Sequence, residues 1–220
     1  MQKIEHNENH HVQVDAAGYR SKKYDTLERF ISYYHQIDEA RKMPIDSVME
    51  IGIGGEVVAN YLKNIGKKVI TCDFDEKTGA DIVSDVRDIK AEDNFVDLVI
   101  ACQILEHIPF EDFTQALSEI KRVSKKYVII SLPYRVSYFE MIIKFPFIRT
   151  LFKKNFFDWS IKVPVKFSGF EKSGQHYWEI DRRKYKLKKI RQQINKEFKI
   201  LNEFSPILNK YHYFFILEIE

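Results

Sequence analysis

Disulfide staples and long apolar runs are both missing from this 220-residue chain. Its two cysteines, Cys72 and Cys102, are too few for the disulfide framework of a small secreted domain, and both fall inside apolar runs that resemble buried strands. The N-terminus lacks an apolar signal segment, and no apolar run approaches the ~20 residues that a membrane-spanning helix needs. We therefore expect a cytoplasmic protein that does not cross a membrane.

Long low-complexity stretches are also absent. Hydrophobic residues make up 45% of the sequence and charged residues 30%, which is a globular composition, and the length suits one domain over residues 1–220. Only residues 1–22 lack periodicity, and we expect them to form a flexible arm. Its histidines, His6, His10 and His11, have no cysteine or carboxylate at a recognised ligand spacing, so we expect no metal site.

Charge is unevenly distributed along the chain. Residues 1–134 hold 17 basic and 23 acidic side chains, whereas residues 135–220 hold 18 basic and 9 acidic ones. An acidic half suits a cationic cofactor, and a basic half suits an anionic small molecule or peripheral contact with an anionic membrane. Charge alone is compatible with nucleic acid too, but we expect a small-molecule partner. The oligomeric state is not predicted by the sequence.

Short apolar runs alternate with amphipathic stretches, as is typical of parallel strands joined by crossover helices. The predicted strands are Ser47–Ile53, Lys68–Phe74, Ile82–Asp85, Phe95–Gln103, Tyr127–Pro133, Phe198–Phe204 and Tyr211–Ile219. The predicted helices are Lys23–Ala40, Glu56–Ile65, Glu111–Ser124 and Arg182–Lys196. This pattern predicts a doubly wound, Rossmann-like α/β fold with helices on both faces of the sheet and an antiparallel hairpin at the end.

Residues 135–180 interrupt the alternation. Ten aromatic residues lie between Arg135 and Phe170, and Pro146 and Pro164 break the stretch. We expect an insertion that caps the acceptor, and the alternative is a surface that rests on a bilayer, because lysines accompany the aromatics. Seven basic residues in ten follow in Arg182–Arg191, which is either a solvated helix face or a site for a phosphate or carboxylate of the acceptor.

A glycine-rich turn joins the first predicted strand to the next helix, in Val48–Glu56. Such turns let a ligand approach the backbone closely. The dinucleotide fingerprint needs a third glycine where this chain has Val57, and a pyrophosphate on the helix would be repelled by Glu56 and Glu50. S-adenosylmethionine has no phosphate and is cationic at its sulfonium and ammonium groups, so electrostatics favours it over NAD.

The next strand ends at Asp73, where a carboxylate can accept both hydroxyls of a ribose, and Asp75 is the competing residue. With these features the chain resembles the class I S-adenosylmethionine-dependent methyltransferase family, in its small-molecule branch with a Leu-Glu-His segment. The segments that carry the resemblance are Glu50–Gly55, Cys72–Asp73, Asp85–Asp88, Phe95–His107, Glu119–Val123 and Ile129–Pro133.

The resemblance implies a mainly parallel seven-stranded sheet with the last strand antiparallel. It further implies that S-adenosyl-L-methionine is the cofactor, and it assigns residues to each part of that molecule. Glu50, Gly52 and Gly54 would frame the methionine moiety, Asp73 would hold the ribose, Asp85 and Val86 would border the adenine, and Gln103 would lie beside the cofactor.

Two histidines are candidates for the chemistry. His107 lies just beyond the fourth strand, at the edge where open α/β sheets bind ligands, or it simply orders the start of a helix. His176 lies in a polar and aromatic cluster and could remove an acceptor proton near neutral pH. Glu179 would either orient this histidine or bind hydroxyls of the acceptor. Tyr134 and Tyr177 are candidate contacts to the acceptor, with packing on the core as their alternative.

We therefore expect methyl transfer to a small, sugar-like or phosphorylated acceptor, on oxygen. One alternative is an NAD-dependent oxidoreductase or epimerase, which Glu56 and Val57 disfavour. Another is a non-catalytic cofactor-binding module that docks on a membrane or RNA through its basic, aromatic half.

Overall fold

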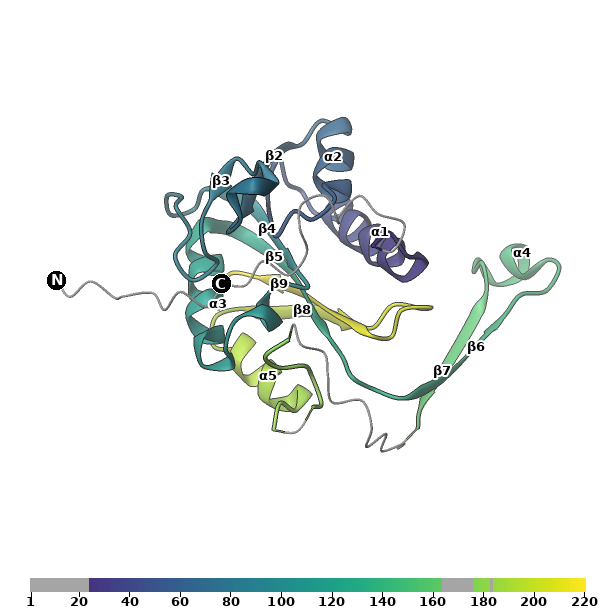
Figure 1. The fold of residues 1–220 in the computed structure, drawn as a ribbon. Coiled ribbons are helices and arrows are strands. Elements are labelled where there is room, and N and C mark those ends of the chain that lie inside the picture. The colour runs from purple at the N-terminus through teal and green to yellow at the C-terminus, as the bar shows by residue number, and fades with distance from the viewer. Residues whose placement is uncertain (1–23, 164–175, 183) are drawn as a thin grey trace.

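The computed structural model describes residues 24–163, 176–182 and 184–220. The predicted arm over residues 1–22, with its three histidines, therefore lies outside the described residues. A seven-stranded sheet forms the centre of the described chain (Figure 1). Its strands are β1 (Ser47–Ile51), β2 (Lys68–Asp73), β3 (Ile82–Val83), β4 (Val96–Cys102), β5 (Ser124–Pro133), β8 (Lys199–Phe204) and β9 (His212–Glu218).

The strands lie in the order β3-β2-β1-β4-β5-β9-β8. The first five pair in parallel, and β9 is antiparallel to both β5 and β8. The predicted Rossmann-like sheet, mainly parallel with its last strand antiparallel, is thus confirmed. Because β1 and β4 are neighbours reached by crossovers in opposite directions, their carboxyl ends mark the switch point of the sheet, which is where such folds bind ligands.

Helices cover both faces of the sheet (Figure 1). Helices α1 (Leu27–Lys42) and α2 (Val57–Asn64) lie on one face, and α3 (Phe113–Val123) and α5 (Leu187–Ile194) lie on the other. Successive side chains of a strand point to opposite faces, so Leu98 and Ile100 of β4 pack with the first pair of helices, whereas Val99 and Ala101 pack with the second. All four side chains are fully buried, which explains the uninterrupted apolar run of the sequence.

Residues 176–180 return the chain to the edge of the sheet after the insertion. Ile180 forms a parallel bridge with Tyr134, directly after β5. Trp178 is fully buried, makes edge contacts with the rings of Phe110 and Phe113, and donates from Nε1 to the carbonyl of Ile108 at 3.1 Å. This tryptophan fixes the segment against the loop that follows β4.

A hairpin that the sequence analysis did not predict projects from this body (Figure 1). It consists of β6 (Tyr138–Ile143) and β7 (Phe157–Lys162), with the short helix α4 (Ile148–Phe152) between them. Its base is held to the loop before β9, where Glu140 accepts from the backbone N–H of Leu208 at 2.9 Å and pairs with Lys210 at 3.1 Å. Among the described residues, no helix is long and apolar enough to cross a membrane.

Candidate active site

The glycine turn after β1 adopts left-handed backbone conformations that favour glycine. Gly52 has a φ of +77°, and a Cβ built there would lie 2.3 Å from Cγ2 of Ile104. Gly54 also has a positive φ, of +48°. Glu56, at the start of α2, is held in the left-handed region at +60°, which costs a non-glycine residue about 1 kcal/mol. The backbone of the turn therefore packs directly against the loop after β4.

Glu50 lies at the end of β1, beneath this turn. It is buried, and none of the described residues gives its Oε2 a hydrogen bond. Burial, with a smaller contribution from the charge of Glu56, raises the pKa of Glu50 to about 8. A buried carboxylate oxygen without a donor is stabilised by any cationic group that can reach it.

Asp73 and Asp75 are placed differently. The buried Asp73 accepts hydrogen bonds from the backbone N–H groups of Ile53, in the glycine turn, at 3.2 Å, and of Asp75 at 3.0 Å. Burial is the main reason that the pKa of Asp73 is raised. Asp75 instead caps the short helix η2 (Glu76–Thr78) by accepting from the backbone N–H of Lys77 at 3.0 Å. Only Asp73 is tied to the glycine turn, and Asp75 has a structural task of its own.

The residues assigned to the adenine and to the end of β4 occupy distinct positions. The carboxylate of Asp85 is bound by Arg87 through Nε at 2.9 Å and Nη2 at 2.8 Å, and Val86 is buried in the core. Gln103 has a φ of +57°, and its backbone N–H donates to the carbonyl of Ser131 at 2.9 Å. That left-handed turn directs the following Ile104 toward Gly52.

His107 and His176, 69 positions apart in the sequence, lie side by side, with ring centroids 4.9 Å apart. His107 belongs to the short helix η3 (Leu105–His107), and the segment of His176 is attached to η3 by a 2.9 Å hydrogen bond from the N–H of Tyr177 to the carbonyl of Glu106. Both candidate histidines of the sequence analysis thus come from segments that meet at the carboxyl edge of the sheet.

Glu179 and His176, which the sequence analysis paired, are in direct contact. Its Oε1 lies 2.9 Å from Nδ1 of His176 and accepts from the hydroxyl of Tyr211 at 3.0 Å. Burial opposes ionisation of Glu179, but these two hydrogen bonds, together with the charges of His176 and Arg182, outweigh it and lower its pKa. Arg135 lies 3.8 Å from the other carboxylate oxygen. A carboxylate that stays charged on Nδ1 favours the tautomer that leaves Nε2 of His176 as a proton acceptor.

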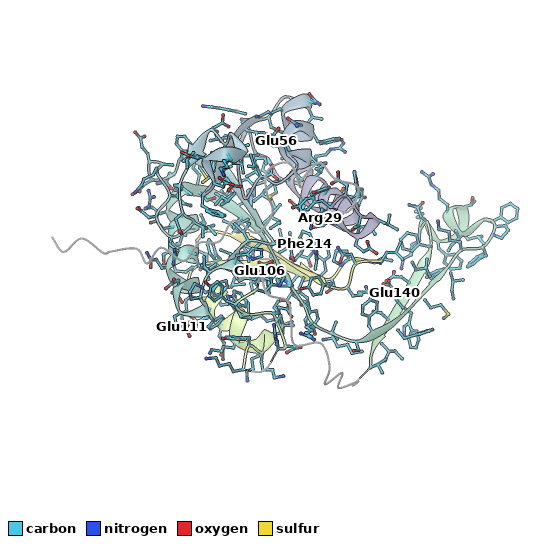
Figure 2. The ribbon with its side chains drawn as sticks, viewed as in Figure 1. Arg29, Glu56, Glu106, Glu111, Glu140 and Phe214 are labelled. Carbon is cyan, nitrogen blue, oxygen red and sulfur yellow. The ribbon has the colours of Figure 1, made fainter. Side chains whose placement is uncertain are left out.

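Glu106 is the residue that sequence reasoning missed. Its side chain is fully buried in the interior of the body (Figure 2), and no described residue gives either carboxylate oxygen a hydrogen bond. Burial, and to a smaller extent the charge of Glu179, raises its pKa to about 8. The sequence feature that could have indicated Glu106 is its position between apolar Leu105 and a histidine. No feature of the sequence indicates that the hydroxyl of Tyr211 lies at this site.

The two candidate tyrosines differ in exposure. Tyr134 is buried, packs edge-on against Tyr213 at 5.3 Å between ring centroids, and its hydroxyl is bound by Lys162. Tyr177 is 54% exposed beside His176. Their contact with an acceptor stays a prediction.

Comparison with known proteins supports the fold and assigns a family model to residues 49–132. Residues 49–132 match the family model described as a methyltransferase domain. None of the curated proteins compared is detectably similar in sequence. Three solved structures illustrate the likeness. The PH0226 protein from Pyrococcus horikoshii OT3 is 16% identical with a TM-score of 0.57, over 92% of this chain and 93% of that one.

The N-methyltransferase NodS from Bradyrhizobium japonicum WM9, solved in complex with S-adenosyl-l-homocysteine, is 7% identical with a TM-score of 0.60, over 89% of each chain. A SAM dependent methyltransferase from Aquifex aeolicus is 15% identical with a TM-score of 0.58, over 94% of this chain and all of that one. At these identities the structural likeness establishes the fold.

Proposed function

We propose that this chain uses S-adenosylmethionine to methylate a small acceptor, on oxygen, at the junction of the glycine turn and the His107–His176 pair. The methyltransferase domain matched by residues 49–132 and the Rossmann-like fold support this proposal. The observation that carries the proposal is this junction. Ile104, which contacts the position of Gly52, is only two residues from Glu106 and three from His107, so cofactor and acceptor groups would meet there. Methyl transfer is an in-line displacement, so placing the two reactants accounts for much of the rate.

The residues around the glycine turn fit S-adenosylmethionine. The buried Oε2 of Glu50 has no donor among the described residues, which suits a cationic ligand, and Asp73 is the carboxylate at the end of the neighbouring strand for the ribose hydroxyls. Gly52 and Gly54 would let the methionine portion approach the backbone, and Gln103 would border it. When bound, this cofactor supplies an electrophilic methyl group.

The structure suits a less direct role for Asp85 at the adenine site. Asp85 is engaged by Arg87 through three hydrogen bonds, one from the backbone N–H and two from the guanidinium, so we propose that it shapes the adenine site through this pair rather than as an unengaged acceptor. Val86 would line the same site from the core side.

The acceptor side is built by residues 176–180 rather than by the hairpin. We assign to His176 the removal of the acceptor's hydroxyl proton at Nε2, with Glu179 holding the ring from Nδ1. Arg135 lies 3.8 Å from Glu179, and the charge of Arg182 lowers the pKa of the same carboxylate after larger effects from burial, His176 and Tyr211. This concentration of arginine beside the histidine suits an acceptor that carries a phosphate or carboxylate, such as a phosphorylated sugar.

Calorimetry with the full-length protein tests the cofactor. S-adenosylmethionine and its demethylated product should bind and raise the melting temperature, whereas NAD should do neither, because Glu56 and Val57 occupy the positions that a pyrophosphate needs. Binding of NAD in preference to S-adenosylmethionine would refute the proposal and favour the oxidoreductase. Cofactor binding without turnover of any phosphorylated or sugar acceptor would favour the non-catalytic module.

The hairpin suits a second role, peripheral contact with an anionic membrane. Residues 141–157 contain four basic side chains, five phenylalanines and no acidic residue. Phe147 is 75% exposed and Leu151 68%, so the far end presents apolar and cationic groups to solvent together. Such a combination partitions into an anionic lipid interface, whereas contact between two copies of this end would bring like charges together. The free cysteines Cys72 and Cys102 fit a position on the cytoplasmic side.

Co-sedimentation with vesicles tests this contact. The protein should bind phosphatidylserine-containing vesicles, less so as salt rises, and should not bind pure phosphatidylcholine. A Phe147→Ser/Leu151→Ser double variant should lose the binding with an unchanged melting temperature, since both side chains are exposed. Equal sedimentation of the variant and the unaltered chain would show that the hairpin does not contact lipid.

A further inference from the structure

Three side chains with metal-ligating atoms converge beside the proposed acceptor site. One potential ligand atom from each of Glu106, His107 and His176 lies within 4.8 Å of the others, and Nε2 of His107 is 3.9 Å from Oε1 of Glu106. They come from two segments, η3 and residues 176–180, which the buried Trp178 and the hydrogen bond from Tyr177 to Glu106 hold together. The cluster therefore belongs to the packed body rather than to an exposed loop.

Glu106 is the observation that points to a cation. Its side chain is 0% exposed, and neither oxygen receives a hydrogen bond from a described residue. Ionising a carboxyl group that is buried without a hydrogen-bond partner costs several kcal/mol, and a cation bound beside it would offset that cost. The imidazole of His107 lies 3.9 Å from Oε1 of Glu106, and two imidazoles with a carboxylate form a ligand set for a divalent ion.

His176 has the arrangement of a metal-bound histidine. Such histidines donate the N–H that is not on the metal to a carboxylate, which fixes the tautomer and the ring orientation. Here Nδ1 of His176 is 2.9 Å from Glu179, and Glu179 is itself held by the hydroxyl of Tyr211 at 3.0 Å. Nε2 is thereby left with its lone pair, as a ligand must be.

We propose that Glu106, His107 and His176 bind one divalent transition-metal ion, with Glu179 as the carboxylate that orients His176. Metal–ligand bonds of about 2.0–2.2 Å require ligand atoms roughly 3–4 Å apart, so the side chains would close by about 1 Å around the ion. Two imidazoles favour Mn²⁺, Co²⁺ or Zn²⁺ over Mg²⁺ or Ca²⁺, which prefer oxygen ligands.

Three protein ligands leave coordination positions for an oxygen of the acceptor. In that role the inference rests on the proposed function and revises the task of His176 within it, because Nε2 would be a metal ligand and could not take the acceptor's proton. The ion would instead lower the pKa of the bound hydroxyl, which would lose its proton to solvent. Metal binding itself needs neither cofactor nor acceptor. The site also differs from what the sequence analysis expected, which was no metal, because it considered only the histidines at the N-terminus.

The test is calorimetric titration of the tag-free, metal-stripped full-length protein with Mn²⁺, Co²⁺, Zn²⁺ and Mg²⁺. We expect one ion per chain for at least one of the first three, with Mg²⁺ at least about tenfold weaker. Glu106→Gln and His107→Ala should each weaken binding by at least about tenfold. In the absence of metal, Glu106→Gln should fold as stably as the unaltered chain or more so, because it replaces a buried ionisable group with an uncharged amide of the same size.

Two controls make the result specific. Glu111→Gln neutralises an exposed glutamate outside the cluster and should leave metal affinity unchanged. A His6→Gln/His10→Gln/His11→Gln variant should retain the one-ion stoichiometry, which excludes capture by the N-terminal histidines. The proposal is overturned if no transition metal binds below millimolar concentration, or if Glu106→Gln and Glu111→Gln bind equally well. S-adenosylhomocysteine binding without metal binding would remove this inference alone; metal binding without S-adenosylhomocysteine binding would remove the proposed function alone.

Discussion

The substitution Asp73→Ala tests whether the carboxylate of Asp73 binds the cofactor or only stabilises the fold. If Asp73 accepts the ribose hydroxyls, Asp73→Ala leaves them without a charged acceptor, which costs roughly 1–3 kcal/mol, or about 5- to 140-fold in affinity. The substitution has a second effect, because Asp73 also accepts from the N–H groups of Ile53 and Asp75. Loss of these two bonds should lower the stability of the ligand-free protein by about 1 kcal/mol each.

Two measurements keep these effects apart. Calorimetry with S-adenosylhomocysteine gives the affinity at a temperature where both proteins are folded, and thermal unfolding without ligand gives the stability. Asp75→Ala is the matched control, since Asp75 lies two residues away and only caps η2, so it should lower stability slightly and leave the affinity within about twofold. A loss of affinity at Asp75 equal to or larger than that at Asp73 would refute the assignment of the ribose site.

Three further predictions concern the turn, the histidine pair and a buried histidine. Gly52→Ala should destabilise the protein by about 1–3 kcal/mol more than Gly79→Ala in chemical denaturation, because both glycines have positive φ but only the Cβ at Gly52 would meet a neighbour. His176→Gln should lower turnover by ~10²–10⁴-fold in a methyl-transfer assay while S-adenosylhomocysteine affinity stays within about twofold; a parallel loss of affinity would place His176 on the cofactor. Burial lowers the pKa of His212 from 6.5 to about 3. Below about pH 6.5 the unfolded chain therefore binds a proton at this residue that the folded chain does not bind until the pH nears 3. The stability of the protein should fall as the pH falls from about 6.5 toward 3, and less steeply in His212→Asn.

The sheet and its helices could be predicted from the sequence because buried strands and helices show a regular pattern of apolar residues. Leu98 to Ala101 form an unbroken apolar run that only a strand covered on both faces explains, and the apolar stripe of α3 recurs at helical spacing. The hairpin leaves no such trace. Most side chains of β6 and β7 are exposed or half-buried on both faces, so no alternation of apolar and polar residues distinguishes them from an irregular insertion.

The candidate site could be predicted only where local sequence carries the information. The glycine turn and Asp73 lie close together along the chain and follow strand ends, so their proximity was foreseeable. The burial of Glu106 was not, because a charged side chain is normally expected at the surface, and the segment that packs beside it, bonded through the N–H of Tyr177 to the carbonyl of Glu106, comes from about 70 positions away.

One residue, Ile104, explains why the two halves of the site lie together. Gln103, directly after β4, has a left-handed conformation, which turns the chain so that Ile104 contacts the position of Gly52 and η3 begins immediately afterwards. The absence of a side chain at Gly52 is thus what lets the loop after β4 lie directly against the cofactor turn. Because Glu106 and His107 follow within three residues, the same close approach brings the groups that would handle the acceptor next to the backbone that would hold the methyl donor.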